Sequence, residues 1–600
     1  MAAYRRFQNK KASAGQSRAH FLRRLSVLTA LFVLACLVFC ITLIGLQVGK
    51  KGFTVYAPAG ETAGHTVKLV PLQALRGEIL DRNGEPLVTN RVAYDACLSY
   101  DSFGAQGGAT ARNRVLLSIA CFLDEQDGLS RPTELFPLVG EYPDLSLNDA
   151  AQDVTSPVYY QMTRVLRALD IQAVSADALV AYYVRHNDLN AQIDGVPLYS
   201  GAQITQLIRL YYELDRYGFA AEGYYPLAED ISTSLIAALK EAQLPCVTIL
   251  SRTVRVLHYP DSTAALMGEV QTLQGQGSIC YNAQGESART SVGISGCESA
   301  FEQYLCGEAG ELRLVLDQTG AIVSQEVIRQ PTPGADVYLS LDISMQLAAH
   351  TALSTVTSAT VGGCAVVLSP QDGSPLAIVT RNTAADELTR NRALDQSFSP
   401  ATALTALRVA AGGTADALTL SLMRAAGLGQ KSGIELGEQP GFLHTDCPIV
   451  HDSDTRVTAL QLCRVLSVTL NAGNSYDCRL LYEVRDSRDQ SVLYHAQPTA
   501  QPAFPMTDAT VEQLMQDMEA HAAQNELWQP QSLSVGVRLS PDADEPLTVG
   551  TAQQSVLLAS VRAQSSSRPA LVGCMVVDGT DALSSLLSAW NTLMQELYAK

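Results

Sequence analysis

The chain carries few side chains whose types and spacing could support nucleophilic chemistry. In the segment 399–405 (SPATALT), the hydroxyls of Thr402 and Thr405 lie three residues apart, which is about one turn of a helix. A threonine hydroxyl is a poor nucleophile unless an adjacent base takes its proton, and Thr405 cannot be that base. Between Gln346 and Ala599 the only lysine is Lys431. The segment therefore has no residue that could drive proton transfer.

A second segment of interest is 548–553 (TVGTAQ). Thr548, Val549, Gly550 and Thr551 supply hydroxyls and a glycine but no ionisable group, and such a glycine often only preserves strand geometry. Thirteen cysteines, two of them in an apolar run near the N-terminus, leave eleven elsewhere. They show no C-x-x-C and no Cys/His spacing typical of zinc, so we expect no metal and no cofactor, while disulfide pairing stays open.

Charge and hydropathy are unevenly distributed over the 600 residues. Nine Lys or Arg and no acid precede residue 52, which leaves 33 basic and 60 acidic residues, a formal net charge of −27, in the remaining chain. This acidic body argues against nucleic acid as its partner, because phosphate binding needs a basic face.

Residues 25–48 carry no charge and are long enough to cross ~30 Å of hydrocarbon as a helix. More basic residues precede this run than follow it, so we expect a cytoplasmic tail at 1–24, a single transmembrane helix at 25–48 and an extracytoplasmic main body in the cell membrane. A cleaved signal peptide is the alternative, but the run exceeds the usual ~7–15 residues and no A-x-A-like site follows.

Local patterns predict hairpins and amphipathic helices. Asn83-Gly84 and Thr319-Gly320 predict tight hairpin turns. Apolar residues at three- and four-residue spacing predict a mixed, largely helical segment at about 103–260. Helices are also expected at about 343–357 and 581–598, and strands beside the last one indicate a sheet with a helix across one face.

Five sequence blocks carry a family resemblance. The first runs from residue 76 to 90 and is similar to R-G-x-I-x-D-R-N-G-x-x-L-A-x-N, and the second runs from 296 to 307 and is similar to G-x-E-x-x-x-E-x-x-L-x-G. Blocks at 333–346, 432–441 and 458–462 follow. In this order they resemble the class B penicillin-binding proteins, the cell-wall transpeptidases of bacteria, over nearly the whole chain except about 103–260. The residues that carry the pedestal motif are Arg76, Gly77, Asp81, Arg82, Asn83, Gly84, Glu298 and Glu302.

The resemblance assigns roles that this chain does not fill. Active members acylate the serine of an S-x-x-K motif, complete the cleft with S-x-N, and use K-T-G on an edge strand to bind the substrate carboxylate. Thr402 stands at the serine position and Thr405 at the lysine position. No asparagine lies between Asn391 and Asn471, so S-x-N is absent there. Thr548 and Val549 replace the Lys and Thr of K-T-G-T, whereas Gly550 and Thr551 remain.

Loss of all three motifs predicts a catalytically inactive homologue that acts as scaffold or regulator in a cell-wall division or sporulation complex. By analogy, its partners would be a membrane glycosyltransferase and division proteins, and its cleft leaves room for a peptidoglycan peptide. Two alternatives stay open: an active D,D-transpeptidase or carboxypeptidase that uses Thr402, and a peptidoglycan or β-lactam sensor that is not acylated.

The predicted fold is α+β on one N-terminal transmembrane helix. The resemblance implies an elongated pedestal, or dimerisation-type domain, at about 52–340, with the helical insertion at about 103–260. A transpeptidase-like domain at about 341–600 would follow, with a mainly antiparallel sheet flanked by helices.

Overall fold

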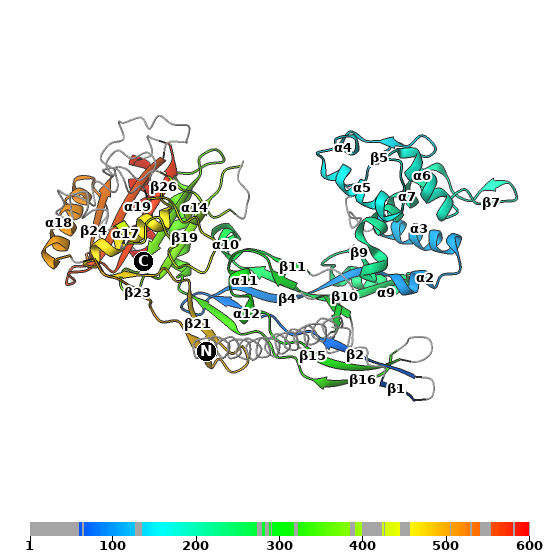
Figure 1. The fold of residues 1–600 in the computed structure, drawn as a ribbon, viewed down its shortest axis with the longest axis horizontal. Helices are drawn as coiled ribbons and strands as arrows, with labels where there is room; N and C mark the ends of the chain where they lie inside the picture. The colour runs from blue at the N-terminus through cyan, green and yellow to red at the C-terminus, as the bar shows by residue number, and fades with distance from the viewer. Residues whose placement is uncertain are drawn as a thin grey trace, which may run out of the picture. The chain divides into compact units, whose positions relative to one another are not determined.

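The computed structural model describes fifteen stretches of the chain (Figure 1), namely residues 59–62, 65–125, 135–272, 279–281, 287–289, 291–316, 322–384, 390–398, 423–424, 426–443, 456–504, 506–527, 531–539, 554–579 and 583–598. The predicted transmembrane run, the segment 399–405 and the segment 548–553 lie outside them. Within the described stretches, no helix combines the length and the apolar character that crossing a membrane requires.

Two compact units make up the described chain. The smaller unit contains the described residues up to Leu69 together with Arg313–Glu326, and the larger unit contains Val70–Leu312 and Val327 onwards. In the smaller unit, β1 (Ala59–Thr62) pairs antiparallel with β2 (His65–Leu72). The adjacent strands β15 (Gly310–Leu316) and β16 (Ile322–Arg329) flank the predicted Thr319-Gly320 turn, which itself lies outside the described residues.

A seven-stranded sheet of the larger unit contains the first motif. Its order is β10-β4-β3-β17-β21-β22, with β9 also paired to β4. The predicted hairpin is present: β3 and β4 pair antiparallel, and the turn between them contains Gly84 at φ +91°, a conformation that glycine adopts without strain. The strands are β3 (Ile79–Leu80), β4 (Pro86–Ser99), β9 (Tyr224–Ala228), β10 (Val247–Leu257), β17 (Asp336–Leu339), β21 (Leu481–Arg485) and β22 (Val492–His495).

The segment predicted as a helical insertion is helical only in part. Its last residues form β10, which pairs with β4 along eleven consecutive residues, and β9 precedes it. β-branched residues dominate β10, which favours a strand over the helix that apolar spacing suggested. The helices are α2 (Tyr100–Gly104), α3 (Ala109–Glu125), α4 (Asp149–Gln152), α5 (Pro157–Ala168), α6 (Ala176–His186), α7 (Gly201–Tyr217), α8 (Phe219–Glu222) and α9 (Thr233–Ala242).

This helical module has its own apolar core. In α7, Ile204, Leu207, Ile208 and Tyr211 recur at helical spacing and are buried against α3 and α5. A capping box between Ser200 and Gln203 begins α7, so the first backbone N–H groups have partners. Two short hairpins complete the module: β5 (Leu138–Val139) with β6 (Ser146–Leu147), and β7 (Gln192–Ile193) with β8 (Val196–Pro197).

Short elements lead from the module to the second large sheet. They are α10 (Pro260–Met267), β11 (Val270–Thr272), β12 (Ile279–Tyr281), β13 (Ser287–Arg289), β14 (Ser291–Gly293), α11 (Gly296–Ala300), α12 (Glu302–Leu305) and α13 (Ile343–Ser354). α13 matches the helix predicted at 343–357 but ends three residues earlier. The carboxylate of Asp342 caps its first turn by accepting from the N–H groups of Ser344 and Met345.

The five-stranded antiparallel sheet near the C-terminus is covered on both faces. Its order is β19-β18-β26-β25-β24. In β18, Val366 packs into the core that contains α17, whereas Ala365 and Val367 pack into the core that contains α13 and α19, so the strand is apolar throughout. The remaining elements are β18 (Gly363–Leu368), β19 (Pro375–Arg381), α14 (Arg392–Asp395), α17 (Ala459–Leu470), β20 (Ser475–Tyr476), β23 (Ala500–Gln501), α18 (Asp508–Gln524), β24 (Leu533–Leu539), β25 (Gln554–Ala563), β26 (Leu571–Asp578) and α19 (Leu583–Tyr598).

α19 is the predicted C-terminal helix, with its described part beginning at Leu583 rather than Asp581. It buries Trp590 against the sheet, where Gly573 leaves space: a Cβ at that glycine would lie 2.9 Å from the indole. Besides Cys97, eight cysteines of the described stretches are free thiols, and five of these eight are buried. The five buried thiols behave as small apolar residues rather than as parts of a disulfide framework.

Candidate functional site

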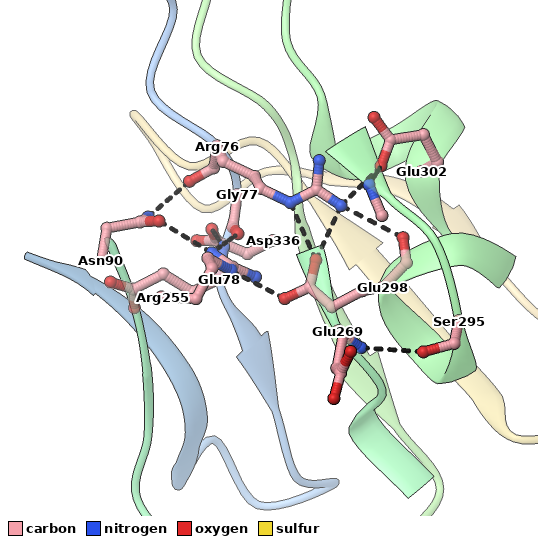
Figure 2. Close-up of polar contacts among 11 residues, drawn as sticks. Arg76, Gly77, Glu78, Asn90, Arg255, Glu269, Ser295, Glu298, Glu302 and Asp336 are labelled. Atoms are coloured by element: carbon pink, nitrogen blue, oxygen red, sulfur yellow. Dashed lines mark hydrogen bonds and ion pairs between the residues drawn. The ribbon is translucent and has the colours of Figure 1, made fainter. Parts of the chain in front are cut away.

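Part of the pedestal motif lies around the buried Arg76: Figure 2 shows Glu298 and Glu302 beside its guanidinium. Nε of Arg76 donates to Glu298 at 2.8 Å, and its Nη2 donates to Glu302 at 2.6 Å. Arg76 comes from the segment between β2 and β3, whereas the two carboxylates come from α11 and α12. Two sequence blocks more than 200 residues apart therefore meet in one ion-pair network.

A second arginine, which sequence reasoning missed, completes the network. Arg255 on β10 donates to Glu298 at 2.7 Å, to the side chain of Asn90 at 2.8 Å and to the carbonyl of Gly77 at 2.8 Å. In the β4–β10 ladder, Arg255 stands directly opposite Asn90. No sequence signal marked it, because it lies outside the family blocks and in a segment predicted to be largely helical.

Burial makes this network electrostatically sensitive. Burial opposes the charge on Arg76, but its hydrogen bond to Glu302 and the charge of Glu298 outweigh that effect and raise the pKa of Arg76. Burial lowers the pKa of Arg255 because the attraction of Glu298 does not offset it. Removing one partner would leave another charge buried without compensation, which is far costlier than losing an exposed pair.

The carboxyl of Glu78 lies at the edge of the same network. Its backbone N–H donates to the side chain of Asp336 at 3.0 Å, which ties β3 to β17. Burial, followed by repulsion from Asp336, raises the pKa of Glu78, while Arg255 and His258 act in the opposite direction.

Close backbone approach explains two of the glycines here. A Cβ on Gly77 would lie 2.0 Å from the carbonyl oxygen of Ala335, and one on Gly334 would lie 1.9 Å from that of Leu305. Neither contact is tolerated, so Gly77 and Gly334 are needed for close packing, unlike Gly84, which serves the turn. The N–H of Gly77 in turn donates to Leu305 at 2.9 Å.

The turn residues of the motif join β3 to the beginning of α13. Asp81 is fully buried, and its carboxylate accepts from the N–H groups of Asn83 at 2.7 Å and Ile343 at 3.1 Å. The side chain of Asn83 donates to Asp342, and the backbone of Arg82 donates to Leu341. The predicted motif therefore positions the first helix of the transpeptidase-like part.

A second polar arrangement lies beside α17. Thr458 and Gln461 form a capping box, and the amide of Gln461 also donates to the carbonyls of Gln430 at 2.9 Å and Pro440 at 2.7 Å. These bonds hold the block at 432–441 against the helix. Lys431, the one lysine of this region, is exposed at the start of that block.

The segment predicted for K-T-G-T follows an edge strand of the five-stranded sheet in the chain. That strand is β24, one of the two edges of the sheet, and it reads LSVGVRL over residues 533–539. It contains no lysine. The positions predicted for K-T-G-T, namely Thr548, Val549, Gly550 and Thr551, lie between β24 and β25 in the chain and outside the described residues, as do Thr402 and Thr405. Their geometry therefore contributes nothing to the site described here.

Comparison with known proteins agrees with this arrangement. Residues 71–339 match the family model of the penicillin-binding protein dimerisation domain. The probable peptidoglycan D,D-transpeptidase PbpC of Pseudomonas aeruginosa is 26% identical over 194 residues, which are 30% of this chain and 32% of that protein. The chain is a homologue of the class B penicillin-binding proteins. Penicillin-binding protein 3 of Bacillus subtilis is 29% identical over 135 residues, 22% of this chain and 19% of its own length. The matches thus span a third or less of these curated relatives.

Solved structures of penicillin-binding proteins share the fold of this homologue at low identity. Penicillin-binding protein 2B of Streptococcus pneumoniae superposes with a TM-score of 0.50 at 16% identity, covering 89% of this chain and 100% of that one. Penicillin-binding protein 2X of Streptococcus thermophilus gives 0.52 at 13% identity, covering 89% and 80%. A structure described as a peptidoglycan synthase complex that coordinates polymerization and crosslinking gives 0.51 at 18% identity, covering 96% and 98%.

The charged side chains of the pedestal network in this penicillin-binding protein homologue pair with one another. Its buried arginines and carboxylates are mutually neutralised, and no group of metal-ligating side chains occurs in the stretches that the structure describes. The pedestal motif has a structural role, because its ion pairs connect the segment before β3 to α11 and α12.

Proposed function

We propose that the chain is a catalytically inactive penicillin-binding protein that acts as a scaffold or regulator in peptidoglycan synthesis. The observation that carries the proposal is the shortage of lysine: Lys431 alone lies between Gln346 and Ala599, and it is exposed beside a turn. Thr402 at the nucleophile position would need a neighbouring base, and Thr405 cannot act as a base.

The third motif supports the same proposal. K-T-G supplies a cation for the substrate carboxylate, whereas this chain has Thr548 at the lysine position and Val549 at the threonine position. Meanwhile the pedestal motif keeps every charged partner, with Arg76, Arg255, Glu298 and Glu302 all engaged. A protein selected for binding rather than catalysis would keep the pedestal ion pairs and lose the catalytic motifs.

We place the protein in the cell membrane, with residues 25–48 spanning it, residues 1–24 in the cytoplasm and the acidic body outside. The structural neighbour described as a peptidoglycan synthase complex supports a membrane glycosyltransferase as partner in a division or sporulation assembly. A peptidoglycan peptide is the ligand class that a degenerate cleft of this family would take.

Fluorescent penicillin labelling of the full chain tests the proposal. An active class B protein serves as positive control, and a Thr402→Ala variant reports on the site. We expect no covalent adduct with the chain while the control labels. An adduct that Thr402→Ala abolishes would overturn the proposal in favour of an active transpeptidase or carboxypeptidase. Reversible binding of penicillin without an adduct would favour the sensor.

A further inference from the structure

One corner of the helical module combines exposed apolar side chains with acidic ones. Val139 on β5, Val154 in the turn between α4 and α5, and Tyr160 on α5 are 54%, 68% and 66% exposed. Single exposed apolar residues are common on proteins and need no explanation. Here three lie on neighbouring elements and each is more than half exposed; we call this region the α4–α5 corner.

The corner is held rigidly. The N–H of Asn148 donates to Pro137 at 2.9 Å and its side chain donates to Phe136 at 2.9 Å, which fixes α4 beside the strand β5. The same side chain accepts from Ala151 and thereby caps α4, and α4 packs on α5. The labels of α4, α5 and β5 lie together in Figure 1. A preorganised surface binds with little loss of conformational entropy.

The charge around the corner has one sign. Residues 135–163 contain Glu141, Asp144, Asp149 and Asp153 but no Lys, Arg or His. The four acids are exposed, and Asp144 and Asp149 lie between Val139 and Val154 along the chain. Across residues 100–246 there are 19 acidic and 9 basic side chains, so no neighbouring excess of positive charge compensates them.

We propose that the α4–α5 corner docks a basic, apolar segment of a partner polypeptide. Apolar side chains of that segment would cover Val139, Val154 and Tyr160, while its lysines or arginines would face Asp144 and Asp149. Charge complementarity selects this occupant, because an anionic lipid surface or a nucleic acid would be repelled by the same acids. The inference goes beyond the proposed function and holds whether or not the chain can be acylated.

Synthetic peptides of equal length test the docking. A fluorescent peptide of alternating Lys and Leu is titrated with the full chain in neutral-lipid nanodiscs, with empty nanodiscs as background. Peptides of alternating Lys and Ser, and of alternating Glu and Leu, separate the contribution of charge from that of apolar contact. Fluorescence anisotropy at low and at physiological salt gives the affinity. We expect the Lys–Leu peptide alone to bind tightly, and salt to weaken it.

Matched variants locate the site. Asp144→Lys with Asp149→Lys should weaken binding about tenfold, which corresponds to about 1.4 kcal/mol. Asp101→Lys with Glu241→Lys changes the net charge equally on exposed positions of α2 and α9 and should leave the affinity within about twofold. Val154→Ser with Tyr160→Ser should also weaken the Lys–Leu peptide by about tenfold.

Three results would overturn the inference. Equal weakening by the two charge-reversal pairs would mean general attraction to an acidic protein. Equal affinity of the Lys–Ser and Lys–Leu peptides would show that the apolar side chains take no part. Absence of binding by every peptide would remove the site altogether. Far-ultraviolet circular dichroism of each variant ensures that the comparison is between folded proteins.

Discussion

The guanidinium of Arg76 donates to the carboxylate of Glu298 at 2.8 Å, and both side chains are almost wholly buried. Replacing the arginine by alanine would leave Glu298 paired with Arg255 alone and would remove the cation that Glu302 contacts. We expect Arg76→Ala to destabilise the fold by about 3–5 kcal/mol, the usual effect of breaking a buried pair. Urea unfolding of the full chain, followed by circular dichroism, measures it.

Arg91→Ala is the matched control for that variant. Arg91 also pairs with a carboxylate, that of Asp230, but the two side chains are 46% and 45% exposed. Its removal should leave the unfolding midpoint unchanged within error. If Arg76→Ala proved as mild as Arg91→Ala, the pedestal network would not stabilise the protein.

Gly77→Ala should destabilise the protein by about 1–3 kcal/mol or more, since the added methyl group would meet a backbone oxygen 2.0 Å away. Gly437→Ala adds the same methyl group where nothing lies within 4 Å and should be neutral. Thermal midpoints of the two variants give the comparison. Equal midpoints would mean that β3 and β17 do not approach as closely as described.

Stability should depend on the protonation of Glu78. Burial and repulsion from Asp336 raise its pKa above its ordinary value of 4.5, so the folded state binds this proton more tightly than the unfolded state. Stability from this group therefore falls as pH rises from about 4.5 through the raised pKa. Glu78→Gln should remove that fall and be more stable than the native chain near neutral pH.

Thermal midpoints of the native chain and Glu78→Gln, compared from about pH 4 to about pH 7, isolate this one carboxyl from all others. We expect the two curves to separate as pH rises. Parallel curves would rule out a raised pKa for Glu78.

Restoring the first motif alone should not restore activity. The double variant Thr402→Ser with Thr405→Lys would recreate S-x-x-K, but S-x-N is absent and Thr548 replaces the lysine that would bind the substrate carboxylate. Fluorescent penicillin should therefore leave this variant unlabelled. Robust labelling would instead show that the first motif is the only defect.

Sequence patterns anticipated local features of the fold well. The Asn83-Gly84 turn, α7 and α13 each follow from a turn signal or a helical period that acts within a few residues. The strand β10 was taken as part of a helical segment, because its identity depends on eleven partners in β4 that are far away in the chain. Local periodicity carries no information about such pairing.

The candidate site was predictable only where the family motif marks it. Arg76, Glu298 and Glu302 were picked out by their blocks, yet nothing in the sequence indicated that they meet or that Arg255 joins them. The sequence could not show that β24 lies at an edge of its sheet, because a strand becomes an edge only through the order of the sheet. The prediction for residues 548–551 stays a prediction.

The seven-stranded sheet has a consequence for how the protein is made. Its middle strand β17 ends at Leu339, next to the predicted domain boundary at 340, but pairs with β21, which begins only at Leu481. During synthesis, β17 must wait for more than a hundred further residues before its second neighbour exists. The pedestal sheet is therefore completed by the last third of the chain. A fragment that stopped at residue 340 would leave β17 with an unpaired edge. Such a fragment would be prone to aggregate rather than form a smaller functional protein.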